Sequence, residues 1–143
     1  MRFEDIVFVY HLRDERQISW HGRRHAHPDC AFELHYFVSG EGSFRNGSVV
    51  WSIKPGSIHL TPPDSIHQIL ATNLRKPITY FAILFDAKED PELSALLTRA
   101  TRLMEKPISI GTSHRFFFAD LLERHASSQK DLVEACRHSF MSF

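Results

Sequence analysis

The first 85 residues alternate short apolar segments with turn residues. The segments are rich in β-branched and aromatic side chains, and glycine, proline and asparagine separate them, which is typical of antiparallel β-structure. Asn46-Gly47 predicts a tight type I′ hairpin, because both residue types tolerate a positive φ. We expect strands at residues 6–12, 32–38, 42–45, 49–53, 57–60, 66–71 and 78–85.

After residue 85 the apolar residues recur at helical spacing. Asp90-Pro91 offers an N-cap acceptor followed by a proline, whose missing N–H is harmless in the first turn of a helix. An apolar stripe from Leu93 to Met104 then predicts a first helix. Pairs at i,i+4 spacing within residues 117–122 predict a second helix.

A third helix is expected from Ser128, where Ser128 and Asp131 have the spacing of a capping box. Its apolar face runs to Phe140, and the pattern is unbroken at Phe143, with no glycine cap or polar tail. We therefore expect this sequence to be truncated before a further domain. A short protein with a frayed last helix is the alternative.

Composition favours one structural unit in the cytoplasm. The chain has 143 residues, 43% of them hydrophobic, which is enough for one core. The 17 basic and 17 acidic side chains leave no basic excess for binding a nucleic acid. The apolar run at 81–85 is far shorter than the roughly 20 residues of a membrane span, so no membrane contact is expected. The two cysteines lie far apart and form no CxxC, so no disulfide framework is indicated. Charged residues precede any apolar run at the N-terminus, so no secretory leader is expected, and a reducing cytoplasm fits best.

Two motifs in the strand region resemble those of the cupins. The segment from Gly22 to Gly40 is similar to the first cupin motif, with an HxH pair, a downstream glutamate and a glycine. The segment from Gly56 to His67 resembles the second, although Asp64 stands where glycine is usual and Ala71 where asparagine is common. The resemblance implies a mainly β fold, a cupin (double-stranded β-helix or jelly-roll) barrel followed by C-terminal α-helices.

Within the cupins, residues 32–42 and 55–63 are similar to the N-terminal sensing domains of AraC-type regulators. The resemblance implies a small-molecule effector in the barrel, helices that mediate dimerisation, and a separate C-terminal domain that reads DNA. We accordingly divide the chain into a sensing barrel at 1–90, with residues 1–19 as an N-terminal arm, and a helical dimerisation segment at 91–143 of the same unit.

The histidines of these motifs have a spacing that suits a metal. Histidines at i and i+2 on an extended segment project to one face, and a glutamate on a neighbouring strand can face the same space. Such ligands suit zinc, nickel, iron or manganese. A bulge or longer turn must bring the glutamate into register, and a metal-free polar pocket is the open alternative. The predicted metal ligands are His25, His27, Glu33 and His67.

Strand parity predicts the residues that contact an effector. His35 and Phe37 share the parity of Glu33 and should face the cavity, whereas residues 34, 36 and 38 should face away. Trp51 and Tyr80 offer stacking surfaces. Aromatic residues of a small barrel are, however, more often core residues than ligand contacts.

These observations favour a binding protein over an enzyme. We expect the effector-sensing and dimerisation domain of an AraC-type transcriptional regulator, without catalytic residues. Its partners would be a small-molecule effector, a second copy bound through the C-terminal helices, and DNA only through a domain absent from this chain. The alternative is a small metal-dependent cupin enzyme of the dioxygenase or isomerase type.

Overall fold

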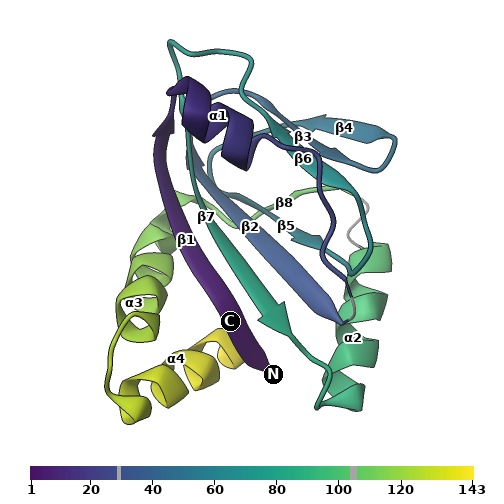
Figure 1. Cartoon of the computed structure of the whole chain (residues 1–143), viewed down its shortest axis with the longest axis vertical. Coiled ribbons are helices and arrows are strands. Elements are labelled where there is room, and N and C mark those ends of the chain that lie inside the picture. The colour runs from purple at the N-terminus through teal and green to yellow at the C-terminus, as the bar shows by residue number, and fades with distance from the viewer. Residues whose placement is uncertain (29, 104–105) are drawn as a thin grey trace.

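The computed structural model describes residues 1–28, 30–103 and 106–143 and contains two sheets and four α-helices (Figure 1). All seven expected strands are present, and the first begins earlier than expected, at Arg2. In chain order the elements are β1 (Arg2–Leu12), α1 (Glu15–His21), β2 (Ala31–Ser39), β3 (Ser43–Asn46), β4 (Val49–Ser52), β5 (Ser57–Thr61), β6 (His67–Leu70), β7 (Ile78–Asp86), α2 (Pro91–Leu103), β8 (Ile108–Ser109), a 3-10 turn (Thr112–His114), α3 (Arg115–His125) and α4 (Lys130–Ser142).

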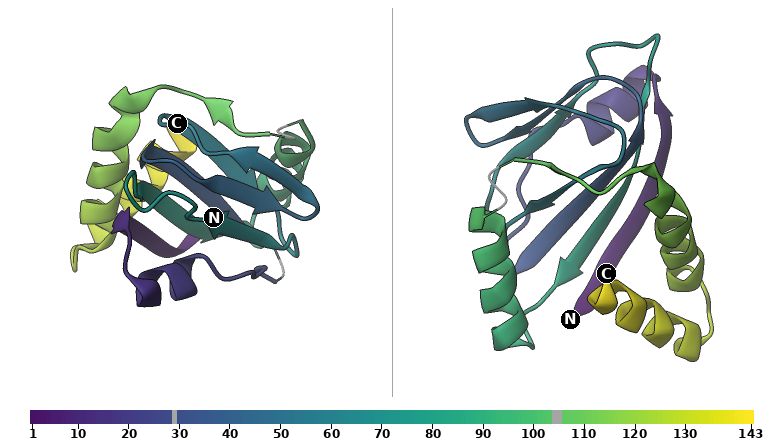
Figure 2. Two further views of the ribbon diagram at one scale, coloured as in Figure 1. Left: turned by 90° about the horizontal axis from the view of Figure 1, so that it is seen from above. Right: turned by 180° about the vertical axis from the view of Figure 1, so that it is seen from behind.

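The strands form two antiparallel sheets that face each other (Figure 2). The larger sheet has the order β1-β7-β2-β5-β8, and the smaller has the order β4-β3-β6. The expected β3–β4 hairpin is present, but its turn lies one residue later than predicted: Asn46 pairs with Val49, so Gly47 and Ser48 form the turn. Of Asn46 and Gly47, only Gly47 has the positive φ that a type I′ turn requires at both positions, with a φ of 58°. This two-sheet barrel with trailing helices confirms the expected cupin fold class. The apolar core between the sheets comprises Val9, Leu12, Phe37, Phe44, Ile53, Ile69, Ile78, Tyr80 and Ala82.

A second apolar layer lies on the outer face of the larger sheet, under the C-terminal helices. Leu34 and Tyr36 belong to it, and the ring of Tyr36 stacks on Phe118 of α3 with centroids 4.4 Å apart. The Tyr36 hydroxyl donates a hydrogen bond to the Gly111 carbonyl at 3.0 Å. Even-numbered residues of β2 thus face the helices and odd-numbered ones face the barrel interior, as parity predicted.

The structure confirms the predicted N-cap of α2 and contradicts the predicted N-cap of α4. The Asp90 carboxylate accepts the Leu93 N–H at 3.0 Å, so the predicted N-cap of α2 is confirmed. Met104, expected in the same stripe, lies outside the described residues. The predicted capping box at Ser128 is wrong: α4 has Gln129 at its N-cap, without a side-chain cap. The hydroxyl of Ser127, and not that of Ser128, accepts the Gln129 N–H.

The N-terminal segment expected to form an arm divides into two parts. Residues 2–12 form β1 at the edge of the larger sheet, where it pairs with β7. Ile6, Val9 and Leu12 of this strand are buried, so it is part of the folded core and not a free arm. Residues 15–21 form α1, which Asp14 caps by accepting the backbone N–H groups of Arg16 and Gln17. Figure 1 shows α1 next to the C-terminal end of β1, at the end of the molecule opposite α4. Among the described residues, no helix has the length and apolarity to cross a membrane.

The stacked pair of Tyr36 and Phe118 should stabilise the attachment of α3 to the sheet. We expect Phe118→Ala to lower the free energy of unfolding by about 3–5 kcal/mol, because Phe118 is fully buried. The matched control Phe116→Ala, on the same helix but 69% exposed, should change it by less than about 0.5 kcal/mol. Urea denaturation measures both values, and equal losses would contradict this packing.

Candidate metal and ligand site

Three histidines converge on one carboxylate inside the barrel. The Nε2 atoms of His67, His27 and His25 lie 2.5, 3.2 and 3.9 Å from Oε2 of Glu33. All four potential ligand atoms lie within 4.8 Å of one another. The structure therefore brings together the four residues that the sequence singled out, and their role as metal ligands stays a prediction.

Backbone contacts fix the positions of these side chains. His25 and His67 exchange two backbone hydrogen bonds, of 3.1 and 2.8 Å, and so form an isolated β-bridge to the start of β6. The Asp64 N–H donates to the carbonyl of His27 at 2.8 Å. Cys30 has a φ of 36° in the turn that precedes β2, which provides Glu33. This turn at Cys30 lies between His27 and Glu33, where the sequence required a bulge or a longer turn.

Backbone carbonyls also set the tautomers of two rings. Nδ1 of His25 lies 3.0 Å from the Arg23 carbonyl, and Nδ1 of His67 lies 3.0 Å from the Ser65 carbonyl. A carbonyl oxygen only accepts, so each Nδ1 must carry the hydrogen and donate it. In the neutral ring, Nε2 then presents a lone pair to the centre of the group, which is the arrangement that metal-binding histidines adopt.

The atoms around Glu33 fit a shared cation. A neutral His67 ring would place its Nε2 lone pair against a carboxylate oxygen only 2.5 Å away, which is repulsive unless a cation lies nearby. A proton on His67 would satisfy this one contact. A divalent metal would satisfy all four ligands, because ligand distances of about 2.0–2.2 Å place the donors roughly 3–4 Å apart. Ligand type and spacing therefore fit a transition metal.

The surrounding charges keep the Glu33 carboxyl ionised. Burial alone would raise its pKa, but His35 beside it and hydrogen bonds with His27 and His67 hold that pKa well below its usual range. Burial lowers the pKa of His25 and lowers that of His35 to about 3. The site thus combines an anionic carboxylate with a His25 ring that favours its neutral form, as metal binding requires of these two ligands.

A cavity of about 170 Å³ opens beside this group. His35 and Tyr80, two of the predicted effector contacts, line it. Phe37 does not, because its fully buried ring packs in the core against Phe44 and Tyr80. Trp51 lies on β4 beside a different surface hollow, so the structure does not bring it to this cavity. The full lining is Asp5, Val7, Trp20, His21, Arg23, His25, His27, Glu33, His35, Tyr80, Ala82 and Leu84.

Several residues of this lining were not predicted. Asp5 and Val7 come from β1, and Trp20, His21 and Arg23 come from α1 and the turn after it. None of these five residues was singled out from the sequence. The signal that could have located α1 is Asp14 followed three residues later by Gln17, the spacing of an N-terminal helix cap.

Comparison with known proteins identifies one matching family. The family described as "AraC-like ligand binding domain" matches residues 8–137, which is most of the chain. A search of curated proteins finds no match.

Solved structures of similar fold include several cupins. A cupin protein from Bacteroides fragilis is 25% identical, with a TM-score of 0.41, and the match covers 46% of this chain and 53% of that one. A conserved protein with a double-stranded β-helix domain from Klebsiella pneumoniae is 20% identical, with a TM-score of 0.44, covering 62% and 73%. The Mn(II) oxalate decarboxylase of Bacillus subtilis is 15% identical, with a TM-score of 0.40, covering 47% and 18%. This chain thus spans about half the length of the Bacteroides fragilis protein.

Buried histidines should make the protein less stable in mild acid. His59 is 1% exposed, and burial lowers its pKa from 6.5 to about 4. Between these values the unfolded chain binds a proton that the folded chain does not, so the stability present above pH 6.5 is lost as the pH falls toward 4. Urea denaturation across this window should show His59→Gln with a slope shallower by up to about 1.4 kcal/mol per pH unit.

The matched control for this prediction is His138→Gln, because the His138 side chain is 71% exposed. Its slope should equal that of the unmodified protein. A His59→Gln variant that loses stability with pH as steeply as the unmodified protein would contradict the assignment.

Proposed function

The chain belongs to the family of AraC-like ligand-binding domains, and we propose that it is the effector-sensing and dimerisation domain of an AraC-type transcriptional regulator. The observation that carries this proposal is the cavity beside a metal-ready group of three histidines and one glutamate. The effector would bind in this cavity. DNA would be bound by a separate domain outside this chain, in a cytoplasmic protein.

In this proposal, a divalent transition metal is held by His25, His27, Glu33 and His67. A bound metal would supply open coordination positions for an oxygen or nitrogen atom of the effector. The protein's own contribution is to hold the rings with Nε2 inward and to keep the carboxylate ionised. His35 and Tyr80 would border the effector from the sheet, and α1 would cover it from the mouth of the barrel.

Strand β1 provides a physical connection between the cavity and the C-terminal helices. Its inner face contributes Asp5 and Val7 to the cavity. On its outer face, the ring of Phe3 contacts His125 and Phe140, with centroids 5.6 and 5.3 Å apart. A ligand that shifts β1 would therefore alter the packing of α3 and α4, which is what an effector-dependent arrangement of two subunits requires.

A metal-dependent enzyme is the second candidate, because the same ligand set also suits dioxygenase or isomerase chemistry. In that case the open positions of the metal would bind a substrate. Consumption of dioxygen or conversion of a small organic acid by the iron- or manganese-loaded protein would favour the enzyme. We favour the sensing function because of the family to which the chain belongs.

Metal analysis tests the proposed ligand set. After zinc loading and desalting, the protein should retain about one zinc per chain, and the His25→Ala, His67→Ala double variant should retain almost none, because two of its four ligands are removed. The control is the His114→Ala, His138→Ala double variant, whose residues lie outside the cluster and should leave the zinc content unchanged. Equal zinc in both variants would contradict the assignment, and circular dichroism verifies that each is folded.

Sedimentation velocity tests the proposed dimer. Phe116 on α3 and Leu132 on α4 are 69% and 39% exposed, and in a dimer formed through these helices they would be covered. The unmodified chain should sediment as a dimer, and the Phe116→Asp, Leu132→Glu variant should sediment as a monomer. The control Val49→Asp changes an exposed apolar residue on β4 and should leave the dimer intact. A monomer for the unmodified chain at high concentration would contradict the proposal.

A further inference from the structure

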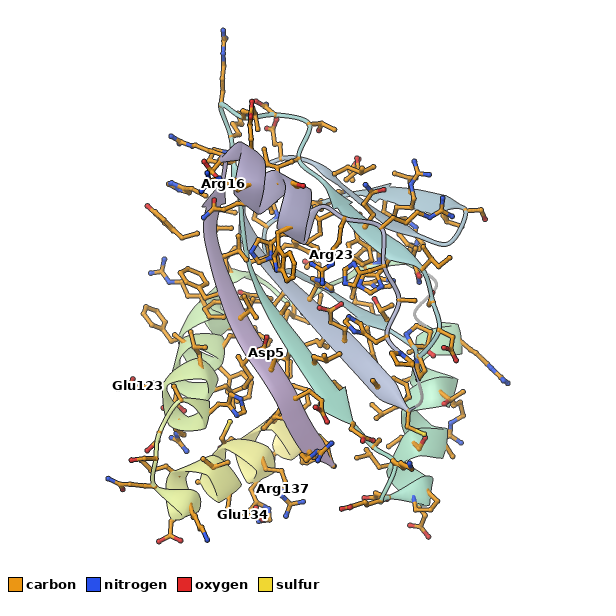
Figure 3. All side chains as sticks on the ribbon, in the orientation of Figure 1. Asp5, Arg16, Arg23, Glu123, Glu134 and Arg137 are labelled. Carbon is orange, nitrogen blue, oxygen red and sulfur yellow. The ribbon has the colours of Figure 1, made fainter. Side chains whose placement is uncertain are left out.

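Two opposite charges face the cavity without being paired to each other. Asp5 and Arg23 both line it. Among the described residues neither takes part in an ion pair. In Figure 3, Arg23 lies beneath α1 and Asp5 lies farther along β1, so the two charges approach the cavity from different elements. Such an arrangement offers one site for an anion and another for a cation.

We propose that Asp5 and Arg23 bind the ammonium and the carboxylate of a small amino acid. The inference rests on the proposed sensing function and specifies the class of effector. A guanidinium recognises a carboxylate through two parallel hydrogen bonds, and a carboxylate accepts hydrogen bonds from an ammonium group. A ligand with one charge of each sign would satisfy both side chains at once, whereas a simple anion or a simple cation would satisfy one.

The guanidinium of Arg23 is held in place while most of its donors remain available. Its carbon lies 4.3 Å from the centre of the Trp20 ring, a cation–π contact. One of its N–H groups donates to the Trp20 carbonyl at 2.5 Å. A guanidinium has five N–H donors, so four are left for a ligand. Trp20 also lines the cavity, and the pair therefore forms one side of its mouth.

A β-bulge places Asp5, which remains exposed to solvent, on the cavity side of β1. In a regular strand Phe3 and Asp5 would share a face, because side chains alternate. The pairing of β1 with β7 shifts between these two residues, with Phe3 opposite Phe85 and Asp5 opposite Leu84. Phe3 can thus pack against the helices while Asp5 faces the cavity together with Leu84. Without this bulge, Phe3 and Asp5 would lie on the same face of β1.

The size and the remaining lining limit the ligand further. A cavity volume of about 170 Å³ lies well below the range of about 300–1,000 Å³ for drug-sized ligands. Val7, Ala82 and Leu84 form an apolar wall. An amino acid with a short apolar side chain, such as alanine, matches this combination of two charges, small volume and one apolar side.

Three probes of nearly equal size separate the charges. L-alanine has both the ammonium and the carboxylate, L-lactate has only the carboxylate, and L-alaninamide has only the ammonium. Isothermal titration of cobalt-loaded, desalted protein should give an affinity for L-alanine at least tenfold higher than for either of the others. Equal affinity for L-alanine and L-lactate would overturn the role of Asp5, and equal affinity for L-alanine and L-alaninamide would overturn that of Arg23.

Matched variants assign each charge. Asp5→Asn should abolish the preference for L-alanine over L-lactate, and Arg23→Gln should abolish the preference over L-alaninamide. Glu4→Gln and Arg24→Gln change neighbouring charges outside the cavity lining and should change nothing. If Asp5→Asn and Arg23→Gln bind all three probes like the unmodified protein, or if no probe binds, the inference is wrong. Cobalt absorption in the same samples reports the metal site separately, so its loss would contradict only the proposed function.

Discussion

A buried carboxylate that faces three imidazole nitrogens needs a positive charge between them, and the interior of this barrel is organised around that requirement. Glu33 is 9% exposed and remains ionised because histidines surround it. Carbonyl groups orient the rings of His25 and His67 so that their lone pairs point inward. Without a cation this arrangement costs free energy, and a bound cation would offset that cost.

The larger sheet separates two environments that must remain different. Its inner face combines the polar group with the core between the sheets, and its outer face is apolar and covered by α3 and α4. Alternation along β2 places Glu33 and Tyr36 on these opposite faces. In both β1 and β2, some side chains face the cavity and others face the helices. A shift of either strand caused in the cavity would therefore also displace the side chains that contact the helices. This is the physical basis of the proposed sensing function.

The sequence predicted the strands and the convergence of four polar side chains because both depend on local patterns. Turn residues and alternation define the strands, and the HxH pair with Glu33 and His67 lies where those strands bring it. It predicted less well what depends on tertiary contacts. The bulge before Asp5 leaves no distinctive residue in the sequence. Trp51 was expected at the cavity but packs against the core between the sheets and beside His59, outside the cavity lining. The N-cap of α4 is Gln129 and not Ser128, and the Ser127 hydroxyl accepts the Gln129 N–H there.

The most direct test of the central claim is X-ray absorption at the zinc edge of the zinc-loaded protein. The account predicts a ligand shell of three imidazole nitrogens and one carboxylate oxygen at about 2.0–2.2 Å. The outer-shell scattering of three histidine rings should accompany it. A shell that contains sulfur, or fewer than three imidazoles, would contradict a metal bound by His25, His27, Glu33 and His67.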